Sequence, residues 1–263
     1  MLLTVVLIGF LLVIGRVLYM AVGAGVIVIP PPPPRKASKV FSIGLSRTGT
    51  TSITVALGRL GWKTYHALIH LAQYPKLGEV GGQARVVKRW SDAFDAFTDI
   101  PASTVYSELA ELYPDAKFVL TTRDPDAWAK SMVSFAPKTL VRSAIENSFF
   151  HTGGLFRAIY GDDWQQNSFE DWRQIYIDYQ QGVQEYFADE QGRLLQLNVT
   201  GGEGWQQLAE FLGVEPEDGA FPHVDVMDLT FGLQLREQFG NIFAWLRYAL
   251  RGGRREARAV ERS

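Results

Sequence analysis

The segment IGLSRTGTTSITVAL, residues 43–57, constrains the fold of this chain more than any other stretch. It continues the apolar run 40–43, which has the length and composition of a short buried strand. A glycine-containing loop separates this run from residues 51–60, where apolar residues recur at helical spacing until Gly61. A strand that turns through glycine into a helix is typical of parallel α/β domains, because parallel strands need crossover connections.

The rest of the central chain repeats this alternation of short apolar runs and helical patterns. Asp124 and Pro125 form a typical helix start, and Ser168 caps a long helix with its apolar residues on one face. The expected strands are 40–43, 63–66, 96–98, 117–122 and 194–197, and the expected helices are 51–60, 104–112, 125–133, the one after Ser168, and 205–212. This order predicts an α/β fold with a parallel sheet and helices on both faces. Ligands of such sheets bind at the carboxyl ends of the strands.

The loop after the first strand has the features of an anion-binding site. Its residues can present consecutive backbone N–H groups at the start of a helix, where the helix dipole attracts negative charge. Arg47 adds a full positive charge. The donor positions are Thr48, Gly49, Thr50, Thr51 and Ser52. The alternative is a glycine-rich turn with a capping threonine and no ligand.

Gly44 and Gly49 have the spacing of the nucleoside-triphosphate loop G-x-x-x-x-G-K-[ST], but Thr50 replaces the lysine. The hydroxyl of Thr51 could contact Mg²⁺, yet the strand that would supply an acidic partner ends in Arg123. A metal-free anion such as a phosphosulfate therefore fits this loop better than a nucleoside triphosphate with magnesium.

Charge is distributed unevenly along the chain. Residues 1–39 carry four basic residues and no acid, and residues 240–263 carry six arginines and two glutamates, so each end has an excess of four positive charges. The net charge is −2, so the middle carries −10, which argues against broad nucleic-acid binding. The chain has no cysteine, which excludes disulfides, thiolate metal sites and cysteine nucleophiles.

Residues 1–29 are predicted to form a membrane anchor, because only Arg16 interrupts the apolar run from residue 2 onward. A cleaved signal or transit segment and a buried helix are the alternatives. A proline-rich linker at 30–38 follows and brings Arg35 and Lys36 close behind the run. The positive-inside tendency then places the main domain on the cytoplasmic side of a single-pass anchor.

Residues 231–263 are predicted to form an amphipathic helix with a basic tail. Apolar residues recur at helical spacing from Leu235 to Leu250, and arginines accompany them. Such a helix could lie on an anionic membrane surface or pack on its own domain with a solvated tail.

Two motifs resemble those of sulfotransferases that use 3′-phosphoadenosine 5′-phosphosulfate (PAPS). The loop SRTGTTS, residues 46–52, is similar to their P-K-S-G-T-T signature, with Arg47 in the lysine place. Residues 117–131, KFVLTTRDPDAWAKS, are similar to their second signature, in which a strand ends in arginine and a serine follows eight residues later. The branch most similar in pattern has G-x-x-R-T-G-T-x-S and R-D-P-x-x-W. The resemblance implies a three-layer, P-loop-like sulfotransferase domain at 39–230.

The resemblance also implies roles for the residues of the two motifs. Thr48, Gly49, Thr50, Thr51 and Ser52 would hold the 5′-phosphosulfate of PAPS. Arg47 would bind the same group and neutralise charge on the bridging oxygen as the sulfuryl group leaves. Arg123 and Ser131 would hold the 3′-phosphate. The implied reaction is an in-line, metal-independent transfer to a hydroxyl or amine.

An acceptor hydroxyl or amine needs a general base. One branch of the family places its base in a His-Leu-Pro motif, and DIP at residues 99–101 occupies a similar place, so Asp99 is the first candidate. His66 is the second candidate and His70 the third. Ser52 stands where another branch has a tryptophan that stacks on adenine.

Two other functions remain open from the residues. The first is a P-loop NTPase or small-molecule kinase, and the second is a non-catalytic, membrane-tethered nucleotide-binding protein. For a sulfotransferase, the expected partners are a small-molecule, sugar or lipid acceptor and the membrane, with no nucleic acid. No metal is expected.

Overall fold

The computed structural model describes residues 38–66, 94–100, 102–147, 159–161, 163–190 and 192–224. The predicted anchor at 1–29 lies outside these residues, as do most of the linker, the segment 231–263 and His70. Among the described helices, none is both long enough and apolar enough to cross a membrane.

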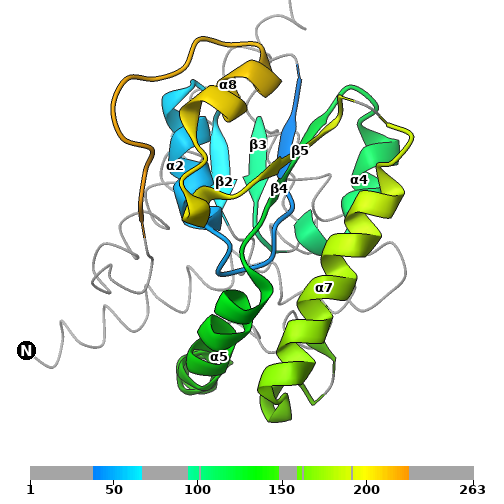
Figure 1. The fold of residues 1–263 in the computed structure, drawn as a ribbon, viewed down its shortest axis with the longest axis vertical. Coiled ribbons are helices and arrows are strands. Elements are labelled where there is room, and N and C mark those ends of the chain that lie inside the picture. The colour runs from blue at the N-terminus through cyan, green and yellow to red at the C-terminus, as the bar shows by residue number, and fades with distance from the viewer. Residues whose placement is uncertain are drawn as a thin grey trace, which may run out of the picture. The chain divides into compact units, whose positions relative to one another are not determined.

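Five parallel strands form one sheet in the order β2-β3-β1-β4-β5 (Figure 1). Their bounds are Val40–Ser42 for β1, Thr64–His66 for β2, Ala96–Thr98 for β3, Lys117–Thr121 for β4 and Leu194–Leu197 for β5. In the register, Phe41 of β1 lies between Phe97 of β3 and Phe118 of β4. All five predicted strands are confirmed, and β1 and β4 each end one residue earlier than expected.

The strand order reverses direction at β1. From β1 the chain passes outward to β2, returns through β3, and then crosses to β4 on the other side. In an open parallel sheet this reversal leaves a crevice beyond the carboxyl ends of the strands, where ligands bind. The anion-binding loop predicted from the sequence directly follows β1 and therefore lies at this point.

The helices cover both faces of the sheet, and α5 continues beyond its carboxyl edge (Figure 1). Their bounds are Thr50–Arg59 for α2, Tyr106–Leu112 for α4, Pro125–Asn147 for α5, Phe169–Tyr186 for α7 and Trp205–Leu212 for α8, with short 3-10 turns at Ala102–Thr104, Trp164–Gln166 and Val199–Gly201. The predicted helices are confirmed. The helix α5 runs well past its expected end at Val133. The sequence did not predict this extension, because apolar residues recur only weakly there and Pro137 interrupts the helical pattern.

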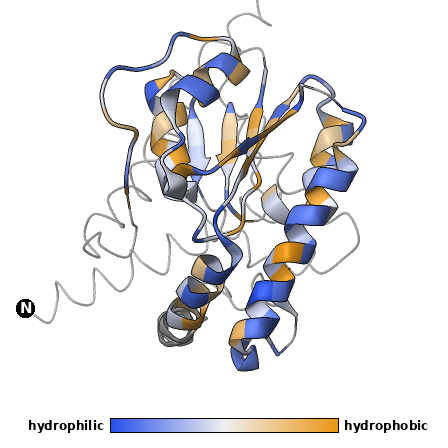
Figure 2. Cartoon of the chain, viewed as in Figure 1, coloured by the Kyte–Doolittle hydropathy of each residue, from blue (hydrophilic) through white to orange (hydrophobic). Residues whose placement is uncertain are grey.

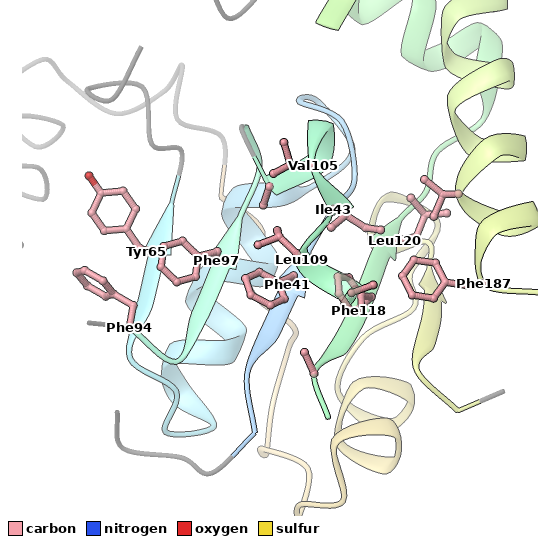
Figure 3. Packing of buried hydrophobic residues seen from close by; sticks show 14 residues of the cluster. Phe41, Ile43, Tyr65, Phe94, Phe97, Val105, Leu109, Phe118, Leu120 and Phe187 are labelled. Carbon is pink, nitrogen blue, oxygen red and sulfur yellow. The ribbon is translucent and has the colours of Figure 1, made fainter. Parts of the chain in front are cut away.

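Two hydrophobic clusters sandwich the sheet, because neighbouring strand residues point to opposite faces. Phe41 and Phe118 pack toward α4 and α7 on one face, against Leu109 and Phe187 (Figure 3). On the other face, a second cluster joins the sheet to α2 and α8. Its central members are Val40, Ile53, Leu57, Ala96, Val119, Leu197 and Leu208. This three-layer arrangement is the predicted fold class.

A third cluster lies between α5 and α7. It is aromatic, and Trp128 and Trp172 are its largest buried members. Figure 2 shows α7 as a mostly hydrophilic helix with interspersed hydrophobic residues, which matches its packing along one face. The helix starts at a capping box, where the Ser168 hydroxyl accepts from the Asp171 N–H at 3.2 Å and the Asp171 carboxylate accepts from the Ser168 N–H at 2.8 Å. The predicted cap at Ser168 is confirmed.

Gly44 allows the loop to pass against β4. A Cβ atom built at Gly44 would lie 1.8 Å from the Thr121 hydroxyl oxygen and 2.8 Å from that of Thr48. These two hydroxyls are hydrogen-bonded to each other at 2.5 Å. Any side chain at position 44 would therefore separate the loop from β4, the strand that leads to Arg123.

We expect Gly44→Ala to lower the free energy of unfolding by about 1–3 kcal/mol, as overpacking of a tight site does. Urea denaturation of the full-length chain measures this change. Gly58→Ala in α2 is the matched control, because its Cβ would meet nothing closer than 3.7 Å. That variant should be stabilised by about 0.5–1 kcal/mol through helix propensity. Equal stability of the two variants would contradict the steric account.

Candidate functional site

The loop between β1 and α2 turns through two left-handed residues. Arg47 has φ of 73° and Gly49 has φ of 97°. The Thr48 hydroxyl donates to the Leu45 carbonyl at 2.7 Å and holds the turn between them. Gly49 is the N-cap of α2 and supplies no side-chain hydrogen bond to the opening amides of the helix. Because these amides have no cap from Gly49, they can receive an anion.

Asp99 holds this loop from the end of β3. It is a non-glycine residue at positive φ, 69°, and it is buried. Its Oδ1 accepts from the Ser46 hydroxyl and the Ile100 N–H, both at 2.8 Å, and its Oδ2 accepts from the Thr50 hydroxyl at 2.8 Å. The Asp99 carboxylate therefore joins both sides of the glycine turn to the neighbouring strand.

His66, at the end of β2, lies beside Asp99. Its Nδ1 lies 2.8 Å from the Thr98 hydroxyl and 3.1 Å from that of Thr54. Its Nε2 lies 4.0 Å from Asp99 Oδ2, and its side chain is 25% exposed. The structure thus brings together the first two candidate bases, although they come from different strands.

Arg47 in the loop contacts Ser131 on α5. The Arg47 Nε donates to the Ser131 hydroxyl at 3.1 Å, and its guanidinium lies over the ring of Phe135 at 5.3 Å. Both contact residues are on α5. The family resemblance implied roles for Arg47 and Ser131 at opposite ends of the ligand, and here the two side chains are in direct contact.

Arg123 follows β4 and lies beside the loop. Its guanidinium donates to the Arg47 carbonyl at 3.0 Å. The Tyr176 hydroxyl accepts from the Arg123 N–H at 2.7 Å and donates to its carbonyl at 2.9 Å. Burial raises the pKa of Tyr176 to about 12, so the hydroxyl stays protonated and keeps both contacts. Asp126, in the first turn of α5, pairs with Arg173 at 2.7 Å.

Two later segments border the loop. A Cβ at Gly49 would lie 3.1 Å from Val199, so the turn after β5 packs on the glycine. The Ser52 hydroxyl accepts from the Val224 N–H at 3.1 Å, which fixes the segment after α8 beside α2. The Ser52 hydroxyl acts as an acceptor in this contact, so its own O–H group can still donate to an anion.

Sequence patterns missed two residues of this site. The sequence presents Ser46 only as the first residue of the SRTGTTS motif, and no pattern predicts that its hydroxyl donates to Asp99. Tyr176 lies on the buried face of α7, where an aromatic residue ordinarily indicates core packing. Neither spacing nor residue type reveals that its hydroxyl reaches Arg123. Among the described residues, no group of three or more His, Cys, Asp or Glu side chains is arranged to bind a metal ion.

Comparison with known proteins identifies a family and a relative. A family model described as "Sulfotransferase domain" matches residues 39–228, which is more than half of the chain. The chain is also 28% identical over 216 residues to "Ava biosynthesis cluster protein M" of Aspergillus versicolor, covering 72% of this chain and 82% of that protein.

We expect Asp99→Asn to lower the free energy of unfolding by about 1.5–3 kcal/mol. Asparagine tolerates the left-handed conformation, so the change isolates the carboxylate. The Ser46 and Thr50 hydroxyls now both donate to the Asp99 carboxylate. The NH₂ group of asparagine would face one of them and could not accept its hydrogen bond. Urea denaturation measures the loss, with Asp126→Asn on the surface as a control that should change little. Equal effects of the two changes would contradict a structural role for the Asp99 charge.

Proposed function

The chain belongs to the sulfotransferase domain family, and we propose that it transfers a sulfuryl group from PAPS to a hydroxyl or amine of an acceptor. The observation that carries the proposal is that Arg123 and Ser131 both contact Arg47 of the glycine loop. This loop follows β1, the strand at which the order of the sheet reverses. These parts come from three separate segments. Together they bring backbone donors, two guanidinium groups and a hydroxyl close to one another, which supports the proposal.

The donor set fits a bisphosphorylated nucleotide. The opening amides of α2 at Thr50, Thr51 and Ser52 suit the 5′-phosphosulfate, because helix N-termini bind anions through backbone N–H groups. Arg123 and Ser131 suit the 3′-phosphate, because arginine binds phosphate oxygens through its planar fork of donors. PAPS would supply the activated sulfuryl group.

Arg47 is the residue best placed to stabilise developing charge. Its backbone has positive φ, and its guanidinium contacts Ser131 and Phe135 on α5. Preorganised cations and backbone donors lower the barrier of group transfer, because they need little reorganisation as charge develops. A ligand anion would compete with Ser131 for the Arg47 guanidinium.

We propose Asp99 as the general base and keep His66 as the second candidate. Oδ1 of Asp99 accepts two hydrogen bonds, whereas Oδ2 accepts one, from Thr50. The oxygen Oδ2 also faces the partly exposed His66. It therefore keeps acceptor capacity on the side from which an acceptor hydroxyl could approach.

The membrane anchor and the cytoplasmic placement of the domain stay predictions from residues 1–39. If the anchor is retained, it favours an acceptor that is itself close to a membrane, such as a lipid. The proposal for the donor does not depend on the anchor.

Calorimetric titration of the full-length chain with adenosine 3′,5′-bisphosphate tests the donor. We expect binding without added metal, weakened at least about 10-fold in Arg123→Ala, as loss of charge-assisted hydrogen bonds predicts. Arg173→Ala, an exposed arginine in an ion pair with Asp126, is the control and should bind like wild type. Binding only of ATP with Mg²⁺ would favour the NTPase alternative. Bisphosphate binding without transfer to any acceptor would favour the non-catalytic one.

Transfer kinetics of Asp99→Asn and His66→Gln separate the two candidate bases. We expect Asp99→Asn to lower kcat at least about 100-fold and His66→Gln less than about 10-fold, since general bases contribute about 10²–10⁴. Circular dichroism under the assay conditions controls for unfolding of Asp99→Asn. The opposite order of effects would make His66 the base.

A further inference from the structure

Two threonine hydroxyls contact the Nδ1 atom of His66, whereas its Nε2 atom faces Asp99. The Nδ1 atom lies 2.8 Å from Thr98 Oγ1 on β3 and 3.1 Å from Thr54 Oγ1 on α2. The two hydroxyl oxygens are themselves 2.6 Å apart. Thr98 is buried, and Thr54 is half-buried. Three polar atoms therefore lie within hydrogen-bonding distance of one another, and each contact needs a proton from one of its partners.

The direction of these hydrogen bonds follows from the number of hydroxyl protons. Thr54 Oγ1 also lies 2.6 Å from the Thr50 carbonyl oxygen, which can only accept, so the single hydroxyl proton of Thr54 is committed there. The short contact between the two hydroxyls then requires the proton of Thr98. The Tyr65 carbonyl is a weaker alternative for that proton, at 3.5 Å. Neither hydroxyl has a second proton to give, so His66 Nδ1 must be a donor.

This assignment decides what His66 presents to the candidate base. A neutral imidazole that is protonated on Nδ1 carries its lone pair on Nε2. The Nε2 atom lies 4.0 Å from Asp99 Oδ2 and 3.4 Å from the Thr51 hydroxyl. With the opposite tautomer, an Nε2–H group would face the Asp99 carboxylate, which is a stronger acceptor than a hydroxyl. That N–H would occupy the oxygen that must receive the proton of the acceptor.

We propose that Thr54 is a positioning residue, which acts through Thr98 to keep the ring proton of His66 on Nδ1. Because Nε2 then carries a lone pair, His66 does not compete with the acceptor for Asp99 Oδ2. The effect on turnover rests on the proposed sulfotransferase function, whereas the tautomer does not. Thr54 lies outside both sequence motifs, and its bond to the Thr50 carbonyl follows from their spacing of four residues in α2.

The first test determines the tautomer from the ring-nitrogen NMR signals of the full-length chain, at a pH at which His66 is neutral. The chain has four histidines, and the signals lost in His66→Ala identify this ring. We expect Nδ1 to be protonated in the wild type. In Thr54→Val, the Thr98 hydroxyl loses its acceptor and can donate to Nδ1 at 2.8 Å, so the ring proton should move to Nε2.

Two further variants separate the hydrogen-bond account from packing. Thr54→Ser keeps the hydroxyl and should keep the ring proton on Nδ1. Thr64→Val makes the same exchange of hydroxyl for methyl at the opposite end of β2, and it should have the wild-type tautomer. A wild-type ring with its proton on Nε2 would overturn the proposal, as would an unchanged tautomer in Thr54→Val.

Transfer kinetics test the consequence for the candidate base. We expect Thr54→Val to lower kcat by about 10-fold, because the acceptor must then displace a hydrogen bond donated to the Asp99 charge. Thr54→Ser and Thr64→Val should stay within about 2-fold of wild type. The Kd for adenosine 3′,5′-bisphosphate should change by less than about 2-fold in all three variants.

A double-mutant cycle with His66→Ala shows whether Thr54 acts through the ring. In the His66→Ala background, Thr54→Val should change kcat by less than about 2-fold. An equal loss of kcat in both backgrounds would overturn the proposed role in turnover. Wild-type kcat in Thr54→Val would overturn it as well.

The NMR measurement separates this inference from the proposed function. The ring-nitrogen signals require neither nucleotide nor turnover. If the wild-type chain transfers no sulfuryl group, the proposed function fails, and the tautomer in Thr54→Val still decides whether Thr54 directs the ring proton of His66.

Discussion

The site depends on a buried carboxylate that the glycine loop surrounds with donors. A carboxylate removed from water is strongly destabilising unless hydrogen bonds replace its hydration. Asp99 receives such bonds from Ser46, Thr50 and the Ile100 N–H. The loop in turn gains fixed points on both sides of its left-handed turn. The same hydrogen bonds therefore position the opening amides of α2 and the candidate base together.

The two long helices, α5 and α7, also contact the loop region and help to hold it. The helix α5 brings Ser131 and Phe135 to Arg47 and sends the Trp128 indole to the Ser46 carbonyl. The helix α7 fixes the backbone of Arg123 through the Tyr176 hydroxyl. The aromatic cluster between the helices therefore does more than exclude water. It also holds together the two helices that contact Arg47 and the backbone of Arg123.

The sheet and helices were predictable because each follows from local patterns. Apolar runs, the Ser168 cap and the Asp124-Pro125 start specify elements without reference to distant residues. The motifs also indicated that Arg123 would lie near the loop. The contacts that orient the site were not predictable, because they join residues far apart in the chain. Nothing local indicates that Ser46 donates to Asp99, or that Tyr176 is more than a core aromatic residue.

The same long-range contacts impose an order on folding. The loop lies near the start of the domain and is synthesised early. Its hydrogen bonds, however, join Ser46 and Arg47 to residues far along the chain: Asp99 is 53 residues away, Arg123 is 76 and Ser131 is 84. Contacts between distant residues form slowly, because the intervening chain must first be closed into a loop. During synthesis, the ribosome must therefore release β3, β4 and the start of α5 before the glycine loop acquires its final shape. A nascent chain that ends before these elements has the motif without the contacts that shape the candidate site.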